Sequence, residues 1–140
     1  MKKTLLFLLL GLLSPIVFAQ KVVSYFDDAE AVQMVIENQT GARLFSIHIC
    51  KTWDEKNEPD AEHWQEFVWS EDLIPSRFFE DDQAEQITIP VDSRTPCSWD
   101  IMVKETENDP TPIIFTNVDF CFLKKLVFFV KNGSIFYKVE

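Results

Sequence analysis

Short runs of alternating apolar and polar residues recur along this 140-residue chain, and no stretch has the longer period of an amphipathic helix. Turn residues separate the runs, most clearly Asn132-Gly133, a two-residue hairpin signal. The predicted strands are residues 32–38, 44–50, 86–91, 98–105, 113–122, 124–131 and 134–139. The pattern predicts an all-β fold, an antiparallel β-sandwich of the immunoglobulin-like or a related kind with about seven or eight strands.

The connections suggest some local pairings. Asn38-Gln39-Thr40-Gly41 supplies turn residues between the first two runs, so we expect residues 32–38 and 44–50 to form a hairpin. Residues 126–130 are apolar on both faces, which predicts a central strand. Residues 51–75 are less regular, and we expect one helical turn near residues 70–74, capped by Ser70.

The N-terminal segment has the layout of a secretory signal peptide. Residues 1–19 combine two lysines, an apolar run of about ten residues, and small residues before a predicted cut at Ala19–Gln20. The run is shorter than the ~20 apolar residues that a membrane-spanning helix needs, so we expect cleavage and no membrane insertion afterwards. The short positive region favours a bacterial periplasm, with release from the cell as the second expectation. Residues 20–140 would form a single domain.

The charge of the chain limits its partners. The net charge is −10, and removal of the two leader lysines would make it about −12. Such a field repels nucleic acid and anionic lipid headgroups and favours cationic partners or Ca²⁺. A need for solubility alone would also explain the negative charge. The chain has no CxxC, HExxH or GxSxG motif and no phosphate-binding glycine loop. We therefore predict no cofactor.

The chain has three cysteines. Because this number is odd, we expect two of them to pair in an oxidising compartment and one to be left over. Cys97 has the same strand parity as the inward-facing Trp99, and Cys121 ends an extended run beside an apolar strand. We expect a Cys97–Cys121 disulfide, with Cys50–Cys121 as the alternative. In the first case Cys50 would remain a buried thiol, or would bridge two copies into a dimer.

A loop rich in tryptophan and acids is the candidate site. Aromatic and carboxylate side chains together suit a contact with a cationic protein. The predicted partner-binding residues are Trp53, Asp54, Glu55, Glu58, Asp60, Glu62 and Trp64. A simpler interpretation is that Trp64 and Trp69 close the end of the sandwich. The sequence thus favours an exported, non-enzymatic binding protein, such as an inhibitor, an immunity-type factor or an envelope accessory subunit.

Two alternatives remain open. The acidic loops, including residues 80–82, could bind Ca²⁺ or a carbohydrate, and His63 could bind a transition metal, so the metal site is unknown. A hydrolase is the remote alternative, because His48 and Cys50 are two residues apart on one strand face and could form a thiol–imidazole pair. No orienting third group or oxyanion hole is recognisable, and we predict no catalytic residue.

Short motifs in a fixed order also resemble those of a group of small secreted bacterial proteins of unassigned function. They are Asn-x-Thr-Gly at residues 38–41, Trp-x-x-Asp-Leu at 69–73, an alternating strand at 87–91, Cys-x-Trp-Asp-Ile at 97–101 and Asp-x-Cys at 119–121. One departure is that acids at residues 80–82 replace the usual glycine. The resemblance covers about residues 32–130 and implies an exported β-sandwich with the disulfide. It implies no catalytic residue.

Overall fold

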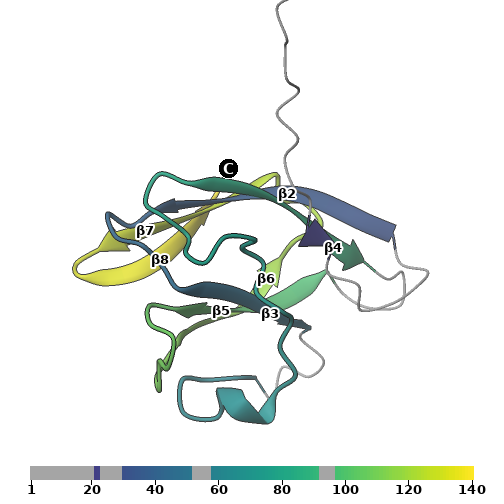
Figure 1. Cartoon of the computed structure of the whole chain (residues 1–140). Coiled ribbons are helices and arrows are strands. Elements are labelled where there is room, and N and C mark those ends of the chain that lie inside the picture. Colours follow the sequence, from purple (N-terminus) through teal and green to yellow (C-terminus); the bar gives the residue numbers. More distant parts are fainter. Residues whose placement is uncertain (1–20, 23–29, 52–57, 92–96) are drawn as a thin grey trace, which may run out of the picture.

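The computed structural model describes residues 21–22, 30–51, 58–91 and 97–140, and within them the chain is nearly all strand (Figure 1). The elements are β1 Lys21–Val22, β2 Glu30–Gln39, β3 Ser46–Lys51, the 3-10 helix η1 Trp64–Glu66, β4 Ala84–Val91, β5 Ser98–Lys104, β6 Ile113–Asp119, β7 Lys125–Lys131 and β8 Ser134–Val139. The expected all-β fold is confirmed. Within these ranges no helix has the length and apolar character needed to cross a membrane.

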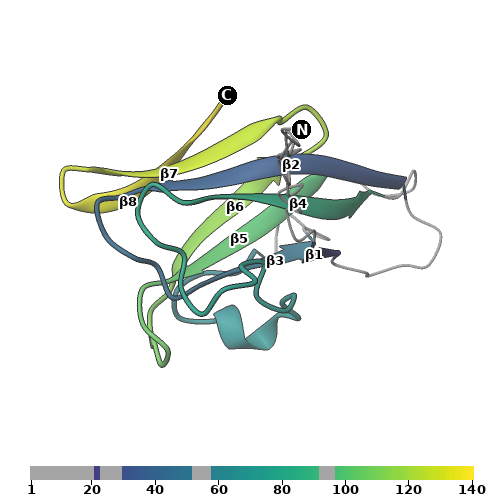
Figure 2. The ribbon, with the colours of Figure 1, turned by 45° about the horizontal axis from the view of Figure 1, so that its top comes forward.

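The strands form two facing sheets (Figures 1 and 2). A five-stranded sheet has the order β1-β4-β2-β7-β8, and a three-stranded sheet has the order β3-β5-β6. Most pairs are antiparallel, but β1 with β4 and β2 with β7 are parallel. Strand β7 lies between β2 and β8, which confirms the expectation that this strongly apolar run is internal.

Strands β7 and β8 form the hairpin that Asn132-Gly133 predicts. Both turn residues have positive φ, 53° for Asn132 and 78° for Gly133. A two-residue turn of this type requires that conformation at both positions, and asparagine and glycine adopt it most readily. The local sequence alone therefore specifies this hairpin.

The hairpin expected between the first two runs is wrong. Strand β2 pairs with β4 and β7, whereas β3 pairs with β5 in the other sheet. The connection after Gln39 carries the chain from one layer to the other. As a result Met34 and Ile36 of β2 face Ile47 and Ile49 of β3 across the interior, and all four side chains are buried.

The core lies between the sheets and is closed on one side by the segment that links β3 to β4. The five-stranded sheet contributes the buried residues Met34, Ile36, Ile87, Ile89, Leu126 and Phe128. The three-stranded sheet contributes Ile47, Ile49, Trp99, Ile101, Val103 and Val118. The linking segment adds Leu73, Ile74 and Phe79. Leu44 and Phe79 exchange backbone hydrogen bonds of 2.9 Å, which fixes the segment against the turn from β2 to β3.

The helical turn expected near residues 70–74 is also wrong, because this segment runs along the edge of β3. The Ser70 amide donates to the Ile49 carbonyl at 2.8 Å, and the Ile49 amide donates to the Ser70 hydroxyl at 3.0 Å. The Ile47 amide donates to Asp72 Oδ1 at 3.0 Å. The side-chain oxygens thus satisfy strand amides, and the segment covers an edge that would otherwise invite pairing with another chain.

Candidate functional site

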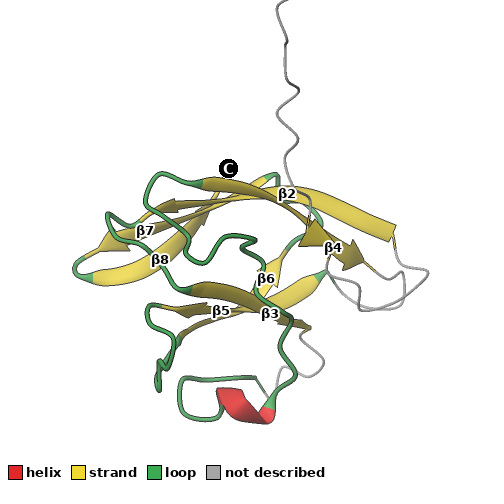
Figure 3. Ribbon diagram, viewed as in Figure 1, coloured by secondary structure: helices red, strands yellow, loops and turns green. Residues whose placement is uncertain are grey.

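The described part of the tryptophan-rich loop covers the outer face of the three-stranded sheet, where Figure 3 shows its one helical turn. Trp64 Nε1 donates to the carbonyl of Pro110 in the β5–β6 hairpin at 3.5 Å. Lys104 Nζ of β5 lies 4.5 Å from the centroid of the Trp64 ring, and Asn117 Nδ2 of β6 donates to Glu58 Oε1. Side chains from two strands therefore hold the loop in place.

The loop exposes an apolar centre. Val68 is 77% exposed. Trp64 and Trp69 are half-buried and lie outside the core cluster, so the core is filled without them. Trp69 Nε1 donates to the Trp64 carbonyl at 2.7 Å, which closes the short segment that contains Val68.

Exposed carboxylates lie on the same loop and on the neighbouring β5–β6 hairpin. Of the residues predicted to contact a partner, Asp60 and Glu62 are exposed, Trp64 is half-buried, and Glu58 is directed to Asn117. The other three, Trp53, Asp54 and Glu55, fall outside the described residues. Glu66 and, on the neighbouring β5–β6 hairpin, Glu107 are exposed acids that the sequence analysis had not assigned. We call Asp60, Glu62, Trp64, Glu66, Val68, Trp69 and Glu107 the acidic–aromatic surface.

Asp60 organises the start of this surface. Its Oδ1 accepts hydrogen bonds from the amides of Glu62 at 2.8 Å and His63 at 2.7 Å. His63 Nδ1 lies 2.9 Å from the same oxygen. This hydrogen bond raises the pKa of His63 above its ordinary value of 6.5 and lowers the pKa of Asp60. The pairing is therefore complete between about pH 3.8 and pH 6.5. It weakens as the pH rises through the raised pKa of His63 and as it falls through the lowered pKa of Asp60.

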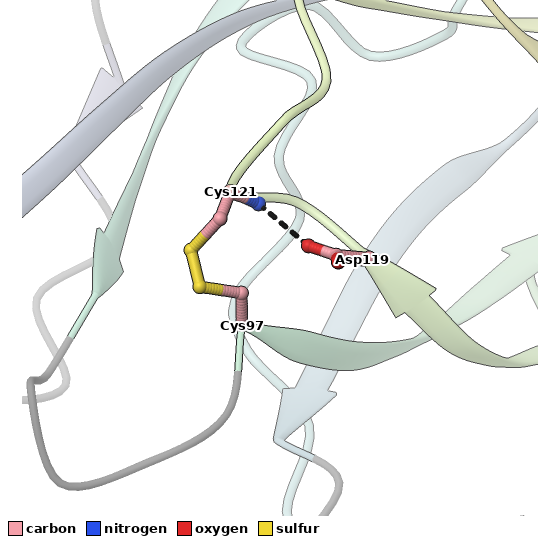
Figure 4. Close-up of side chains that lie close together, drawn as sticks. All are labelled: Cys97, Asp119 and Cys121. Carbon is pink, nitrogen blue, oxygen red and sulfur yellow. Dashed lines mark hydrogen bonds between the residues drawn. A yellow bond between two sulfur atoms is a disulfide. The ribbon is translucent and has the colours of Figure 1, made fainter.

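The acids that the structure describes do not converge as a metal centre would require. Among the described residues, the only three candidate donors within 4.8 Å of one another are Cys97, Asp119 and Cys121. Figure 4 shows that the two sulfurs are bonded to each other, while Asp119 Oδ1 accepts from the Cys121 amide at 3.0 Å. These groups serve the local structure, and they leave no open set of ligands.

The disulfide agrees with the pairing that the sequence favoured. The Cα atoms of Cys97 and Cys121 are 5.3 Å apart, and the bond closes a loop of sequence separation 24. It joins the residue before β5 to the connection after β6, where the Phe120 amide also donates to the Cys97 carbonyl at 2.9 Å. A disulfide is compatible with an oxidising, exported location.

The thiol–imidazole pair considered from the sequence is not assembled. His48 Nδ1 lies 2.8 Å from the Ser70 carbonyl oxygen, and His48 Nε2 lies 2.9 Å from the Ser46 hydroxyl. Cys50 is only 4% exposed, which matches the expected buried thiol. Burial, and secondarily the negative charge of Asp100, raises the pKa of Cys50 to about 11. The structure therefore offers no activated nucleophile at this position.

Cys50 should react slowly in the folded protein. A pKa of about 11 in place of 9.0 lowers the thiolate fraction near pH 8 roughly 100-fold. We expect alkylation by a thiol reagent to be slower by at least roughly this factor than in denaturant, as measured by mass spectrometry with the disulfide intact. Labelling at similar rates in the two conditions would contradict the buried position.

No protein-family model, curated protein or solved structure matches this chain. The resemblance to small secreted bacterial proteins therefore stays an expectation.

Proposed function

We propose that the chain is an exported, non-enzymatic binding protein that contacts a basic protein through its acidic–aromatic surface. The observation that carries this proposal is the 77% exposure of Val68 between Trp64 and Trp69. An apolar centre that contains aromatic side chains and has a charged rim is the usual anatomy of a protein interface. An inhibitor of a basic enzyme, or an accessory subunit of an envelope assembly, would have such a surface.

The charge of the chain supports a cationic partner. The net charge is −10, and the acidic–aromatic surface contributes Asp60, Glu62, Glu66 and Glu107 to it. Opposite charge on a partner would accelerate diffusional encounter and exclude acidic competitors. The proposed export depends on residues 1–19, whose pattern is that of a cleaved leader.

The experiment is affinity capture by residues 20–140 from the envelope and the culture fluid of the source, at low and moderate salt, with mass spectrometry. We expect a stoichiometric basic partner that is retained less at moderate salt, because salt screens exposed charges. Val68→Ser, and the double change Glu62→Gln with Glu66→Gln, should each weaken binding of that partner by about tenfold or more.

Matched variants separate this surface from general effects. Val139→Ser removes another exposed valine, on β8, and Glu80→Gln with Asp82→Asn removes two exposed charges before β4. Both controls should leave the affinity nearly unchanged. The proposal is wrong if the controls and the surface variants lose binding equally, or if no partner is captured at either salt.

A further inference from the structure

A cavity of about 290 Å³ opens beside the β7–β8 turn. It is lined by Glu105, Ile113, Gly133, Ser134 and Ile135. Figures 1 and 2 both show the β7–β8 hairpin extending beyond the three-stranded sheet. The cavity therefore lies where the overhang of the larger sheet meets the beginning of β6.

Incomplete coverage of β8 explains why space remains here. Strand β8 is the edge of the five-stranded sheet, and its core-facing residues Ile135 and Tyr137 are only half-buried. Phe115 of β6 packs edge-to-face on Tyr137 with ring centroids 5.0 Å apart, which closes the sandwich further along. Beyond that contact, Ile113 and Ile135 remain as two apolar walls of the cavity.

Glu105 is the one charged residue among those that line this cavity. None of the ion pairs formed among the described residues includes Glu105. Its amide donates to Asp109 Oδ2 at 3.2 Å, so neighbouring groups fix its backbone. A carboxylate beside apolar walls is complementary to a side chain with a long aliphatic stem and a cationic end.

We propose that the cavity binds one lysine or arginine side chain of the protein partner. The stem would pack between Ile113 and Ile135, and the cationic end would pair with Glu105. This inference rests on the proposed function, because the partner protein would supply the lysine or arginine side chain. The β5–β6 hairpin links the two sites, because it follows Glu105 and presents the Pro110 carbonyl to Trp64.

The test uses small probes, so it does not require the partner. Butylguanidinium represents arginine, butylammonium represents lysine, and N-butylurea is a neutral analogue of the guanidinium probe. Each is titrated into ¹⁵N-labelled protein while amide shifts are followed by NMR. We expect saturable shifts at Gly133, Ser134 and Ile135 with one or both cations and none with the urea. The two cationic arms distinguish an arginine site from a lysine site.

Two substitutions locate the charge that is responsible. Glu105→Gln should weaken binding of the cation roughly twofold to fivefold, whereas Glu80→Gln, an exposed acid before β4 that belongs to neither site, should leave it nearly unchanged. The amide spectrum of each variant also verifies that it folds. The proposal is overturned if the pocket amides do not shift, if the urea shifts them equally, or if both variants bind as the parent does. None of these outcomes depends on partner capture, so the two proposals fail separately.

Discussion

Replacing Asn38 with aspartate should destabilise the fold by about 3–5 kcal/mol, although the two side chains have nearly the same shape. Asn38 is 0% exposed. Its Nδ2 donates to the carbonyls of Ala42 and Phe79, each at 2.8 Å. Its Oδ1 accepts from the amide of Thr40 at 3.0 Å and from its hydroxyl at 2.7 Å. Aspartate would place a buried negative oxygen against two carbonyl oxygens in place of the amide donor.

The measurement is urea denaturation of the parent and the Asn38→Asp variant, near neutral pH and at about pH 4. Protonation of the new carboxyl restores one donor, so the difference in unfolding free energy should be smaller at the lower pH. Asn108→Asp, in the exposed turn between β5 and β6, is the control and should cost less than about 0.5 kcal/mol. If the two variants are equally stable, the buried hydrogen bonds of Asn38 are not what holds this turn.

Loss of the disulfide should be the second large effect. The bond closes a loop of sequence separation 24, and the chain-entropy model assigns about 3 kcal/mol to a loop of this size. For a domain of this length that corresponds to a fall in Tm of roughly 10 °C. We expect this fall in thermal unfolding of the Cys97→Ala/Cys121→Ala variant, followed by circular dichroism.

A reducing agent provides the matched control. It should lower the Tm of the parent toward that of the double variant and leave the variant unchanged, because Cys50 is then the remaining cysteine and has no partner to lose. A parent that is insensitive to full reduction, verified by mass spectrometry, would show that the bond adds little to stability. A variant that shifts equally would show that the reductant acts elsewhere.

Much of the strand content could be predicted because alternation is a local signal. The runs that became β2, β3, β5, β7 and β8 were all recognisable, and Asn132-Gly133 fixed one hairpin. The pairing of β2 was not recognisable. Its partners β4 and β7 are distant in sequence, and a short turn after Asn38 suits a hairpin and a crossing between layers equally well.

The candidate site was predictable in composition and not in shape. The cluster of acids and tryptophans indicated a binding loop, but no part of the pattern indicated that Val68 would be exposed. The segment after Val68 lies at the sheet edge, where the side chains of Ser70 and Asp72 accept hydrogen bonds from amides of β3. Such side-chain to backbone pairing over more than twenty positions leaves no periodic signal. The Ser-x-Asp pattern instead resembled a helix cap.

The attachment of residues 70–74 to β3 also bears on how tightly the surface can bind. The loop is bonded to the edge of β3 at one end and to Asn117 and Pro110 along its length. Because the loop is preorganised in this way, a partner need not supply much free energy to order it. Affinity would then depend on Ser70 and Asp72, which face the sheet. Natural or engineered changes at these two positions would tune the lifetime of a complex without altering its contacts.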